Sequence, residues 1–276
     1  MSLNTFIPKI WSARLLFHLD NALVASNFFN SNWEGEIRDQ GDTVKINQIS
    51  NPNIIPYQRN VDLPAPENLN TIAQELVIDQ AEAFNFQVDD IDRVQTRADL
   101  MDEAMMRAGY QLGMQEDKFL FGRMVASTGS WTNAGALANF EELYELIVHL
   151  RTLMNRNNVP VEGRQLAVPP EATALLLKDP RFVQTGSAQA ENRLATAQIG
   201  RIAGFVVHET NVLDYHVTNE PAIIAGHAAG ATLAHQIVKT EAFRMERRFG
   251  DGLKGLNVYG ARITHPEMFS VATFSI

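Results

Sequence analysis

The chain of 276 residues contains no cysteine. Disulfides, thiolate metal sites and cysteine nucleophiles are therefore excluded. The sequence also has no apolar run near the ~20 residues that span a bilayer, and its start lacks the basic region and apolar core of a signal peptide. We expect a cytoplasmic protein with no membrane segment, an origin with which the missing cysteines agree.

Basic residues are outnumbered, with 23 Lys and Arg against 32 Asp and Glu, so the formal net charge is -9. Proteins that bind nucleic acid tightly usually present a basic face, because contacts to phosphates supply most of their affinity. The longest basic cluster is Arg244, Arg247 and Arg248, which is interleaved with Glu241 and Glu246. Tight or sequence-specific DNA binding is not expected, although an acidic surface could let DNA slide past.

Catalytic motifs are also missing. The seven histidines never form the i, i+4 pair of a metalloprotease helix, and Gly200–Phe205 lacks the features of a phosphate loop. No Gly-x-Ser-x-Gly elbow occurs. A carboxylate pair could still assemble across the fold, as in a glycosidase. We nevertheless predict no catalytic residues, no cofactor site, no metal site and no enzymatic activity.

The composition that is present, 45% hydrophobic and 20% charged, is typical of a soluble globular protein with a sizeable core. The length favours one large domain or two intertwined ones.

The segment Gly41–Asp90 is the most unusual part of the sequence. Two runs of alternating apolar residues predict half-buried strands, and these residues are Val44, Ile46 and Ile49 in the first run and Leu76, Ile78, Phe84, Phe86 and Val88 in the second. The long stretch between them is broken by prolines, and such excursions from a compact domain usually bind something. At its centre, Ile54, Ile55 and Tyr57 are expected to be exposed on an isolated subunit. The alternative is that they fold back onto their own strands.

The N-terminal residues 5–30 form an apolar, weakly amphipathic segment in which Trp11, Leu15 and Leu19 recur every four residues. It packs either on its own domain or on a neighbour. A long helix is predicted from Thr96 to Ala126, opened by a Thr-x-x-Asp capping signal. The sequence "STGSWTNAG" then breaks the helical pattern.

A second helix is predicted to start at Asn139, with Glu142 completing a capping signal and an apolar stripe of period 3.6 along it. Short elements follow: the strand "RQLAV", the helix "PPEATALLLK", and the strands "GFVVHET" and "AIIAGH". The glycines of "GRIAGF" are expected to shape a turn between strands. Strands around the glycine-rich loop "RRFGDGLKG" end the chain and are expected to pack on the long helix. The fold class is therefore α+β, with an α/β subdomain over about 137–235.

Three stretches of sequence, in this order, resemble the major capsid protein of tailed bacteriophages of the Hong Kong 97 type. They are "FIPKIWSARLLFHLDNALVASNFFNSNWEGEI" with "GDTVKI", then "IGRIAGFVVHETN", and finally "IVKTEAFRMERRFGDGLKGLNVYGARITHPE". The resemblance implies a Hong Kong 97-like capsid fold divided as follows: an N-terminal arm over 1–36, an extended two-stranded β-hairpin loop over 37–80, a peripheral domain over 81–136 and 236–276 with a spine helix over 96–126, and an axial domain over 137–235.

The resemblance also implies a function. Copies of the chain would assemble through hexamers and pentamers into an icosahedral virion capsid, built in the cytoplasm of the host bacterium, that encloses double-stranded DNA. Portal and decoration proteins are possible partners, and because the arm starts close to Met1, any scaffolding is expected from a separate protein. Lys45 lies away from the loop tip, so the lysine–asparagine cross-link of the type member is not expected. The alternative is an encapsulin-like nanocompartment that encloses cargo enzymes.

Twelve residues are predicted to make contacts between subunits, from the arm, the loop and the glycine-rich stretch. They are Phe6, Ile10, Trp11, Ile54, Ile55, Tyr57, Arg59, Asp62, Glu67, Arg247, Arg248 and Asp251. The two arginines are expected to pair with Asp251 of a neighbour, or with Asp62 and Glu67 of an overlying loop. The competing interpretation is a solvated charge run, in which exposed pairs contribute only about 0–1 kcal/mol each.

Overall fold

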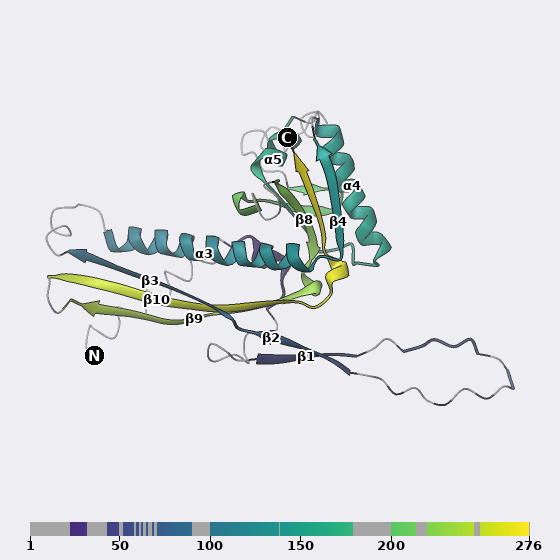
Figure 1. The fold of residues 1–276 in the computed structure, drawn as a ribbon, viewed down its shortest axis with the longest axis horizontal. Helices are drawn as coiled ribbons and strands as arrows, with labels where there is room; N and C mark the ends of the chain where they lie inside the picture. Colours follow the sequence, from purple (N-terminus) through teal and green to yellow (C-terminus); the bar gives the residue numbers. More distant parts are fainter. Residues whose placement is uncertain are drawn as a thin grey trace.

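In the computed structural model, the described strands form three sheets, and a long helix connects the two larger ones (Figure 1). The described residues are 23–31, 43–49, 52–57, 59–60, 62, 65, 68, 71–89, 100–137, 139–178, 200–213, 220–245 and 249–275. Within these ranges, none of the helices is long and apolar enough to cross a membrane.

A three-stranded antiparallel sheet lies beneath the long helix α3 (Leu100–Ser127), in the order β3-β10-β9. Its strands are β3 (Gln80–Asp89), β9 (Ala231–Arg244) and β10 (Gly250–Ile263). Alternate side chains of β3 turn towards the helix. Phe86 of β3 thereby packs with Leu253 of β10 and Met105 of α3. The sheet and the helix together form one elongated layer pair (Figure 1).

Helix α3 confirms the predicted long helix from Leu100 onwards, and it ends one residue later than expected, at Ser127. Thr96 and its capping signal lie outside the described residues. With 28 residues the helix is about 42 Å long at 1.5 Å per residue. Met105 and Leu112, which are about two helical turns apart on the same face, are both buried.

A six-stranded sheet forms the second lobe, in the order β4-β11-β8-β5-β7-β6. Its strands are β4 (Ser130–Ala136), β5 (Arg164–Val168), β6 (Arg201–Ile202), β7 (Phe205–Glu209), β8 (Ala222–His227) and β11 (Ser270–Ser275). Helices α4 (Phe140–Arg156) and α5 (Pro170–Leu176) cover it. The predicted helix after Asn139 is confirmed, and Leu143, Ile147 and Leu150 of its stripe are fully buried. Its capping signal is not formed as expected, because the Asn139 side chain makes no cap hydrogen bond.

The other predicted elements of this lobe, β5, α5, β7 and β8, are confirmed. The turn in "GRIAGF" is confirmed too, because Ala203 and Gly204 have φ of 47° and 88° between the paired strands β6 and β7. Two central residues with positive φ are typical of a type I′ hairpin turn.

The sequence "STGSWTNAG" ends the helical pattern as predicted, because α3 stops at Ser127. Most of the stretch belongs to strand β4, which was not predicted. Its hydrogen-bond partners come from the far end of the chain: β4 pairs in parallel with β11, and the Thr128 hydroxyl donates to the Phe269 carbonyl at 3.1 Å. The segments 130–136 and 270–275 therefore belong to the six-stranded sheet, outside the 137–235 limits of the expected subdomain.

The glycine-rich stretch was also expected to be a loop, but from Gly250 onwards it is the start of β10. The glycines of this strand leave room for aromatic side chains to pack against its backbone. A Cβ at Gly252 would lie 2.5 Å from the Phe243 ring, and one at Gly255 would lie 2.3 Å from the Phe84 ring. The aromatic rings thus cover the bare backbone of the strand.

The remaining two strands, β1 (Thr43–Ile49) and β2 (Thr71–Val77), pair antiparallel as a ribbon that projects beyond the rest of the molecule (Figure 1). The two-stranded loop is thus confirmed for these residues. The second apolar run of the sequence, from Leu76 to Val88, was predicted as one strand but forms parts of two. Leu76 is on β2, whereas Phe84, Phe86 and Val88 are on β3 of the three-stranded sheet. The described residues also form short 3₁₀ helices: η1 (Ala25–Phe28), η3 (Asn211–Leu213), η4 (Ala228–Gly230) and η5 (Pro266–Met268).

Candidate assembly surfaces

The far end of the β1–β2 ribbon presents apolar side chains to solvent. The exposed fractions are 97% for Ile54, 49% for Ile55 and 75% for Tyr57. The prediction that these residues are exposed on a single subunit is confirmed, and the alternative of folding back onto their own strands is not what the structure has. Exposed apolar clusters of this kind are typical of interaction sites. These three residues are called the loop tip below.

Two polar candidates lie next to the loop tip. Arg59 and Asp62 are both exposed, and Asn60 between them has a φ of 65° in a turn. Glu67, the third charged candidate of the loop, lies outside the described residues. Lys45 is on strand β1 opposite Glu75, away from the tip as the sequence predicts.

The base of the ribbon, unlike its tip, is packed firmly on the subunit. Ile46 and Leu76 are buried against Val258 and Ala234 of the three-stranded sheet. The backbones also come close, because a Cβ at Gly260 would lie only 2.4 Å from the Val77 carbonyl oxygen. An isolated two-stranded ribbon is marginal in water. The base is therefore held by its own subunit, whereas the tip is exposed.

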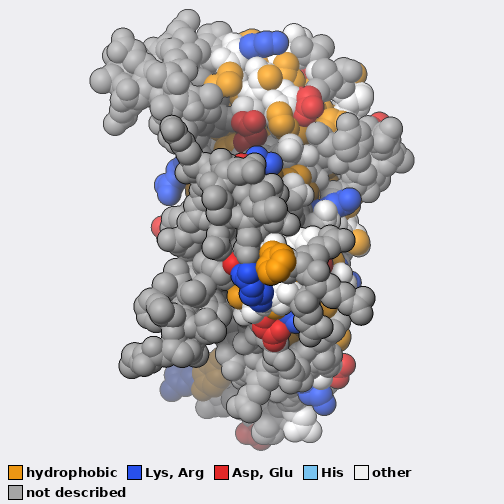
Figure 2. Space-filling model, turned by 90° about the vertical axis from the view of Figure 1, so that its left-hand side faces the viewer, with side chains coloured by type: hydrophobic (Ala, Val, Ile, Leu, Met, Phe, Trp, Pro, Cys, Tyr) orange, Lys and Arg blue, Asp and Glu red, His pale blue; other side chains and the backbone are white. Residues whose placement is uncertain are grey.

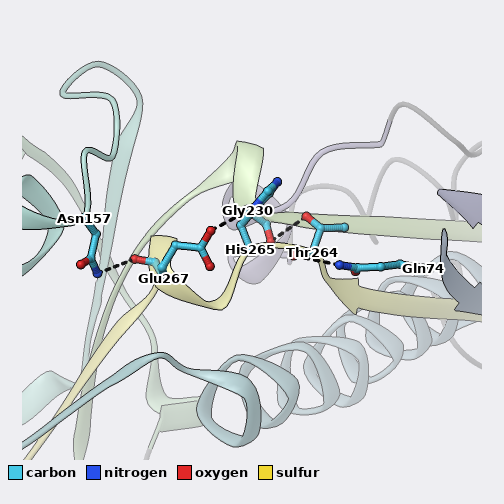
Figure 3. Close-up of polar contacts among 6 residues, drawn as sticks. All are labelled: Gln74, Asn157, Gly230, Thr264, His265 and Glu267. Atoms are coloured by element: carbon cyan, nitrogen blue, oxygen red, sulfur yellow. Dashed lines mark hydrogen bonds and ion pairs between the residues drawn. The ribbon is translucent and has the colours of Figure 1, made fainter. Parts of the chain in front are cut away.

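A polar junction fixes the ribbon to the connection between the two larger sheets (Figure 3). The Gln74 side chain of β2 donates from Nε2 to the Thr264 carbonyl at 3.2 Å. Thr264 in turn donates through its backbone N–H and its hydroxyl to the Gly230 carbonyl, at 2.9 and 3.0 Å. Residues 264–269 lead from β10 to β11, so the ribbon is tied to the point where the chain crosses between lobes.

The same connection is tied to the six-stranded lobe. Asn157, at the end of α4, donates from Nδ2 to the Glu267 carbonyl at 2.9 Å, while the Glu267 carboxylate pairs with His265 Nδ1 at 3.0 Å (Figure 3). The backbone N–H of Gly129 donates to the Pro266 carbonyl at 3.0 Å. One short connection therefore contacts the ribbon, α4 and the exit of α3.

The segment that precedes the ribbon is anchored on its own subunit. The carboxylate of Asp117 on α3 accepts hydrogen bonds from the backbone N–H groups of Val24 and Ala25, at 3.0 to 3.2 Å, at the start of η1. Phe28 is fully buried and meets the Phe121 ring edge-on, with 6.1 Å between ring centroids. For residues 23–31, packing on the same chain is therefore the correct alternative. The candidates Phe6, Ile10 and Trp11 lie outside the described residues.

A second buried carboxylate on α3 faces the opposite way, towards the sheet. Glu116 is fully buried, and its Oε2 accepts a hydrogen bond from Asn257 Nδ2 of β10 at 3.1 Å. Burial raises the pKa of Glu116 to about 7; the nearby Asp117 and Glu82 carboxylates add to the rise, and His235 and Asn257 oppose it. Burial likewise raises the pKa of Asp117 to about 6. Sequence reasoning missed both groups, because two adjacent acidic residues on a helix are usually solvated.

The turn end of the β9–β10 hairpin is the surface that contains the glycine-rich candidates. Figure 2 views the molecule from this side, and it shows a hydrophobic side chain beside basic and acidic ones. Phe249 is 79% exposed here, and Asp251 accepts from Arg244 of the same chain at 3.0 Å. Within one subunit, Asp251 thus has a partner on the neighbouring strand β9. Arg247 and Arg248 lie outside the described residues.

Two of the described histidines, His208 and His227, have structural partners. His208 Nε2 lies 2.8 Å from Gln165 Oε1, and burial lowers the pKa of His208. His227 Nδ1 accepts the backbone N–H of Ala229 at the start of η4. Among the described residues, no three His, Asp or Glu side chains are grouped so that they could hold a metal ion.

Comparisons with known proteins identify relatives of this architecture. A family model described as phage capsid protein matches residues 73–269, more than half of the chain. A solved structure of Mycobacterium phage Che8 is 27% identical, with a TM-score of 0.73, and the match covers 91% of this chain and 90% of that chain. A search of curated proteins found no match.

Two further solved structures are similar at lower identity. The capsid of cyanophage P-SCSP1u is 12% identical with a TM-score of 0.68, and the match covers 87% of this chain and 85% of that one. A virus-like particle from Pyrococcus furiosus is 13% identical with a TM-score of 0.59, and the match covers 96% of this chain and 99% of that one. At such identities the similarity shows the fold alone.

Proposed function

The chain belongs to the phage capsid protein family, and we propose that its copies assemble through hexamers and pentamers into an icosahedral shell around the double-stranded DNA genome of a tailed phage. Its role as a structural capsid protein, not an enzyme, follows from the family and from its structural neighbours. The α+β fold predicted from the sequence matches solved phage capsid structures, and this match supports a Hong Kong 97-like fold.

The observation that carries the proposal is the projecting β1–β2 ribbon. Its base is buried on its own subunit, whereas Ile54 and Tyr57 at its tip are 97% and 75% exposed. A contact between two different patches of identical chains repeats from copy to copy, and it closes into a ring when the rotation permits. Hexameric and pentameric rings are the closed forms that an icosahedral shell requires.

The proposal includes the expected division of the chain into domains, which the arrangement of the three sheets supports. The three-stranded sheet and α3 correspond to the peripheral domain and spine helix, and β1–β2 corresponds to the extended loop. The six-stranded sheet corresponds to the axial domain, to which β4 and β11 are added. The N-terminal arm would span 1–36, and its residues 23–31 would be its anchored part.

The shell would enclose DNA without binding a particular sequence. A net charge of -9 opposes tight contact with phosphates. Packaging into a preformed shell favours walls that let DNA slide. Separate scaffolding, portal and decoration proteins would be the partners, and assembly would take place in the cytoplasm of the host bacterium.

A nanocompartment that holds cargo enzymes is the second candidate. The similarity to the virus-like particle from Pyrococcus furiosus, over 96% of this chain, favours it, although at 13% identity this is a likeness of fold. The genes beside this one discriminate between the two. Portal and terminase genes would indicate a phage, whereas a gene for a cargo enzyme would indicate a compartment.

Electron microscopy of the purified chain tests the proposal directly. The chain should be produced alone and together with the neighbouring genes, and the lysates separated by size. We expect closed icosahedral particles with hexameric and pentameric units. Monomers or dimers alone, in both preparations, would refute the proposed function.

A further inference from the structure

Strand β10 lies between two elements that pack on its opposite faces. Asn257 turns towards α3, where its Nδ2 donates to the Glu116 carboxylate at 3.1 Å. The next residue, Val258, turns the other way and packs on Leu76 at the base of the ribbon. In Figure 1, α3 lies above the sheet and the ribbon base lies below it. A change at the helix face of β10 is therefore only one residue away from the ribbon base.

The sheet is irregular at this same point. In the pairing of β10 with β9, Leu256 is opposite Lys239, but Asn257 is opposite Ile237. One residue of β9 is therefore extra, which makes a β-bulge. A bulge interrupts the ladder of hydrogen bonds and bends its strand. The contact with Glu116 is thus made where the β9–β10 ladder gives the sheet least support.

The pair of Glu116 and Asn257 has two oxygens that lack hydrogen bonds. Glu116 Oε1 and Asn257 Oδ1 are both buried without a hydrogen-bond partner among the described residues. An ionised carboxylate only accepts, so it leaves both oxygens unsatisfied. A proton on Glu116 Oε1 turns that atom into a donor, and Asn257 Oδ1 is an acceptor on the side chain to which Glu116 is already joined. One proton can therefore satisfy both oxygens.

The charged and titratable groups that face Glu116 come from all the elements packed on it. Glu82 of β3 and Asp117 of α3 oppose its ionisation by charge, whereas His235 of β9 favours it. Tyr259 of β10 supplies no counter-charge, because burial, with Glu82 and Glu116 beside it, raises the pKa of its hydroxyl. The surroundings as a whole favour the protonated carboxyl.

The sign of the pH effect follows. Burial is the main cause that raises the pKa of Glu116 from 4.5 to about 7. A packed site whose pKa is raised holds its proton more tightly than an opened site does. Packing of α3 on the sheet is therefore firmest at low pH, and it weakens as the pH rises from about 4.5 to 7. The nearest cation of α3, Arg123, is already paired with Asp79 at 2.7 Å.

We propose that Glu116 and Asn257 form a proton-operated latch, which holds α3 on the three-stranded sheet at the bulge and thereby fixes the base of the ribbon. The protonated pair closes the latch. Ionisation of Glu116 loosens the sheet around the bulge, while the six-stranded lobe stays folded. The inference goes beyond the proposed function, because the latch works inside one subunit whether or not subunits form shells. In a shell, it would make the direction of the ribbon depend on pH.

The adjacent carboxyl group must be read separately. Asp117 accepts from the backbone N–H groups of Val24 and Ala25, and burial raises its pKa to about 6. Its ionisation acts in the same direction as that of Glu116, but on the segment 23–31 and not on the bulge. A method that resolves the two regions is therefore needed.

Hydrogen exchange of the full chain, as dispersed subunits at pH 5.5 and pH 8, tests the latch. Protection factors are corrected for the intrinsic effect of pH and read by peptide. For residues 256–259 we expect a roughly 25-fold loss of protection at pH 8, from the linkage of the Glu116 proton to local opening. Helix α4 should show little change. Glu116→Gln keeps the shape of the protonated pair without titrating, so it should stay protected at pH 8, whereas the exposed Glu103→Gln should behave like the parent.

Three results would overturn the proposal: equal protection at both pH values in the parent, a loss of protection in Glu116→Gln as large as the parent's, or an equal loss in both lobes, which is global unfolding. The parent alone decides if Glu116→Gln does not fold. In the parent, residues 73–77 at the ribbon base should lose protection together with residues 256–259. A ribbon base that stays protected while the bulge opens would show that the latch does not fix the ribbon.

Discussion

Replacement of Glu116 by glutamine should change the stability of the subunit in a way that depends on pH. This carboxyl group is fully buried between α3 and the three-stranded sheet, where Asn257 is its hydrogen-bond donor. Burial raises its pKa from 4.5 to about 7, so the folded state holds the proton more tightly than the unfolded state. Stability therefore falls as the pH rises from about 4.5 to 7, and above pH 7 the folded subunit contains a buried charge.

The size of the effect follows from that pKa difference. A rise from 4.5 to about 7 corresponds to about 3 kcal/mol between fully protonated and fully ionised forms. Between pH 5 and pH 8, the linkage of proton binding to folding lowers the free energy of unfolding by about 2.5 kcal/mol. Glutamine keeps the shape without titrating, although its new N–H donors could cost about 1–3 kcal/mol if unsatisfied. That cost is the same at both pH values. It therefore cancels when the stability difference between variant and parent at pH 5 is subtracted from the difference at pH 8.

Thermal unfolding of dispersed subunits at pH 5 and pH 8 measures this quantity. The Tm of Glu116→Gln minus the Tm of the parent should be roughly 5 °C higher at pH 8 than at pH 5. Glu103→Gln is the matched control, because Glu103 is on the same helix but exposed, with Arg107 at 2.7 Å. A Tm difference that is equal at both pH values, or one that the control reproduces, would refute the argument that Glu116 is ionised at a cost.

Three further predictions concern assembly. Deletion of Asn53–Asn60 should leave a folded subunit that assembles poorly, as seen by circular dichroism and size exclusion, and normal shells would show the tip to be dispensable. Mature shells boiled in denaturant should give a single band near 30.8 kDa, whereas a ladder would indicate covalent linkage and point to Lys45 first. Arg247→Ala with Arg248→Ala should fold normally but give shells that dissociate sooner at high salt, where screening is strongest; shells as resistant as the parent's would mean that these arginines form only a solvated face.

Elements in which apolar residues recur with a clear local periodicity could be predicted from the sequence. Helix α4 has an apolar stripe in which Leu143, Ile147 and Leu150 are fully buried, and the hairpin turn at Ala203 and Gly204 is encoded by adjacent residues. The exposure of the loop tip was also predictable, because prolines at 52 and 56 oppose regular pairing around an apolar cluster. In each case the information lies within one segment.

Features that depend on distant partners could not be predicted in this way. Strand β4 has little strand signal of its own, and β11 at the other end of the chain supplies its ladder. The glycines of early β10 suggest a loop until the Phe84 and Phe243 rings that cover them are known. The burial of Glu116 likewise depends on Asn257, far along the sequence. Local propensity is overridden wherever tertiary pairing provides the hydrogen bonds or the cover.

The base of the ribbon offers a last prediction, which separates folding from assembly. Gly260 lets the β10 backbone approach β2, and a Cβ there would lie 2.4 Å from the Val77 carbonyl and 2.8 Å from the Ile78 Cα. Both are backbone atoms that cannot rotate away, so Gly260→Ala should force β2 outwards at a cost of about 1–3 kcal/mol. Dispersed Gly260→Ala subunits should therefore melt at a lower temperature and also form fewer shells, whereas Ala81→Val, on an exposed site of the adjacent strand, should do neither. Because Ile54 and Tyr57 of the tip are 97% and 75% exposed, its deletion should impair assembly alone. If Gly260→Ala melts like the parent, the ribbon base is not held by this close approach, and the direction of the ribbon must be set by the junction at Thr264 instead.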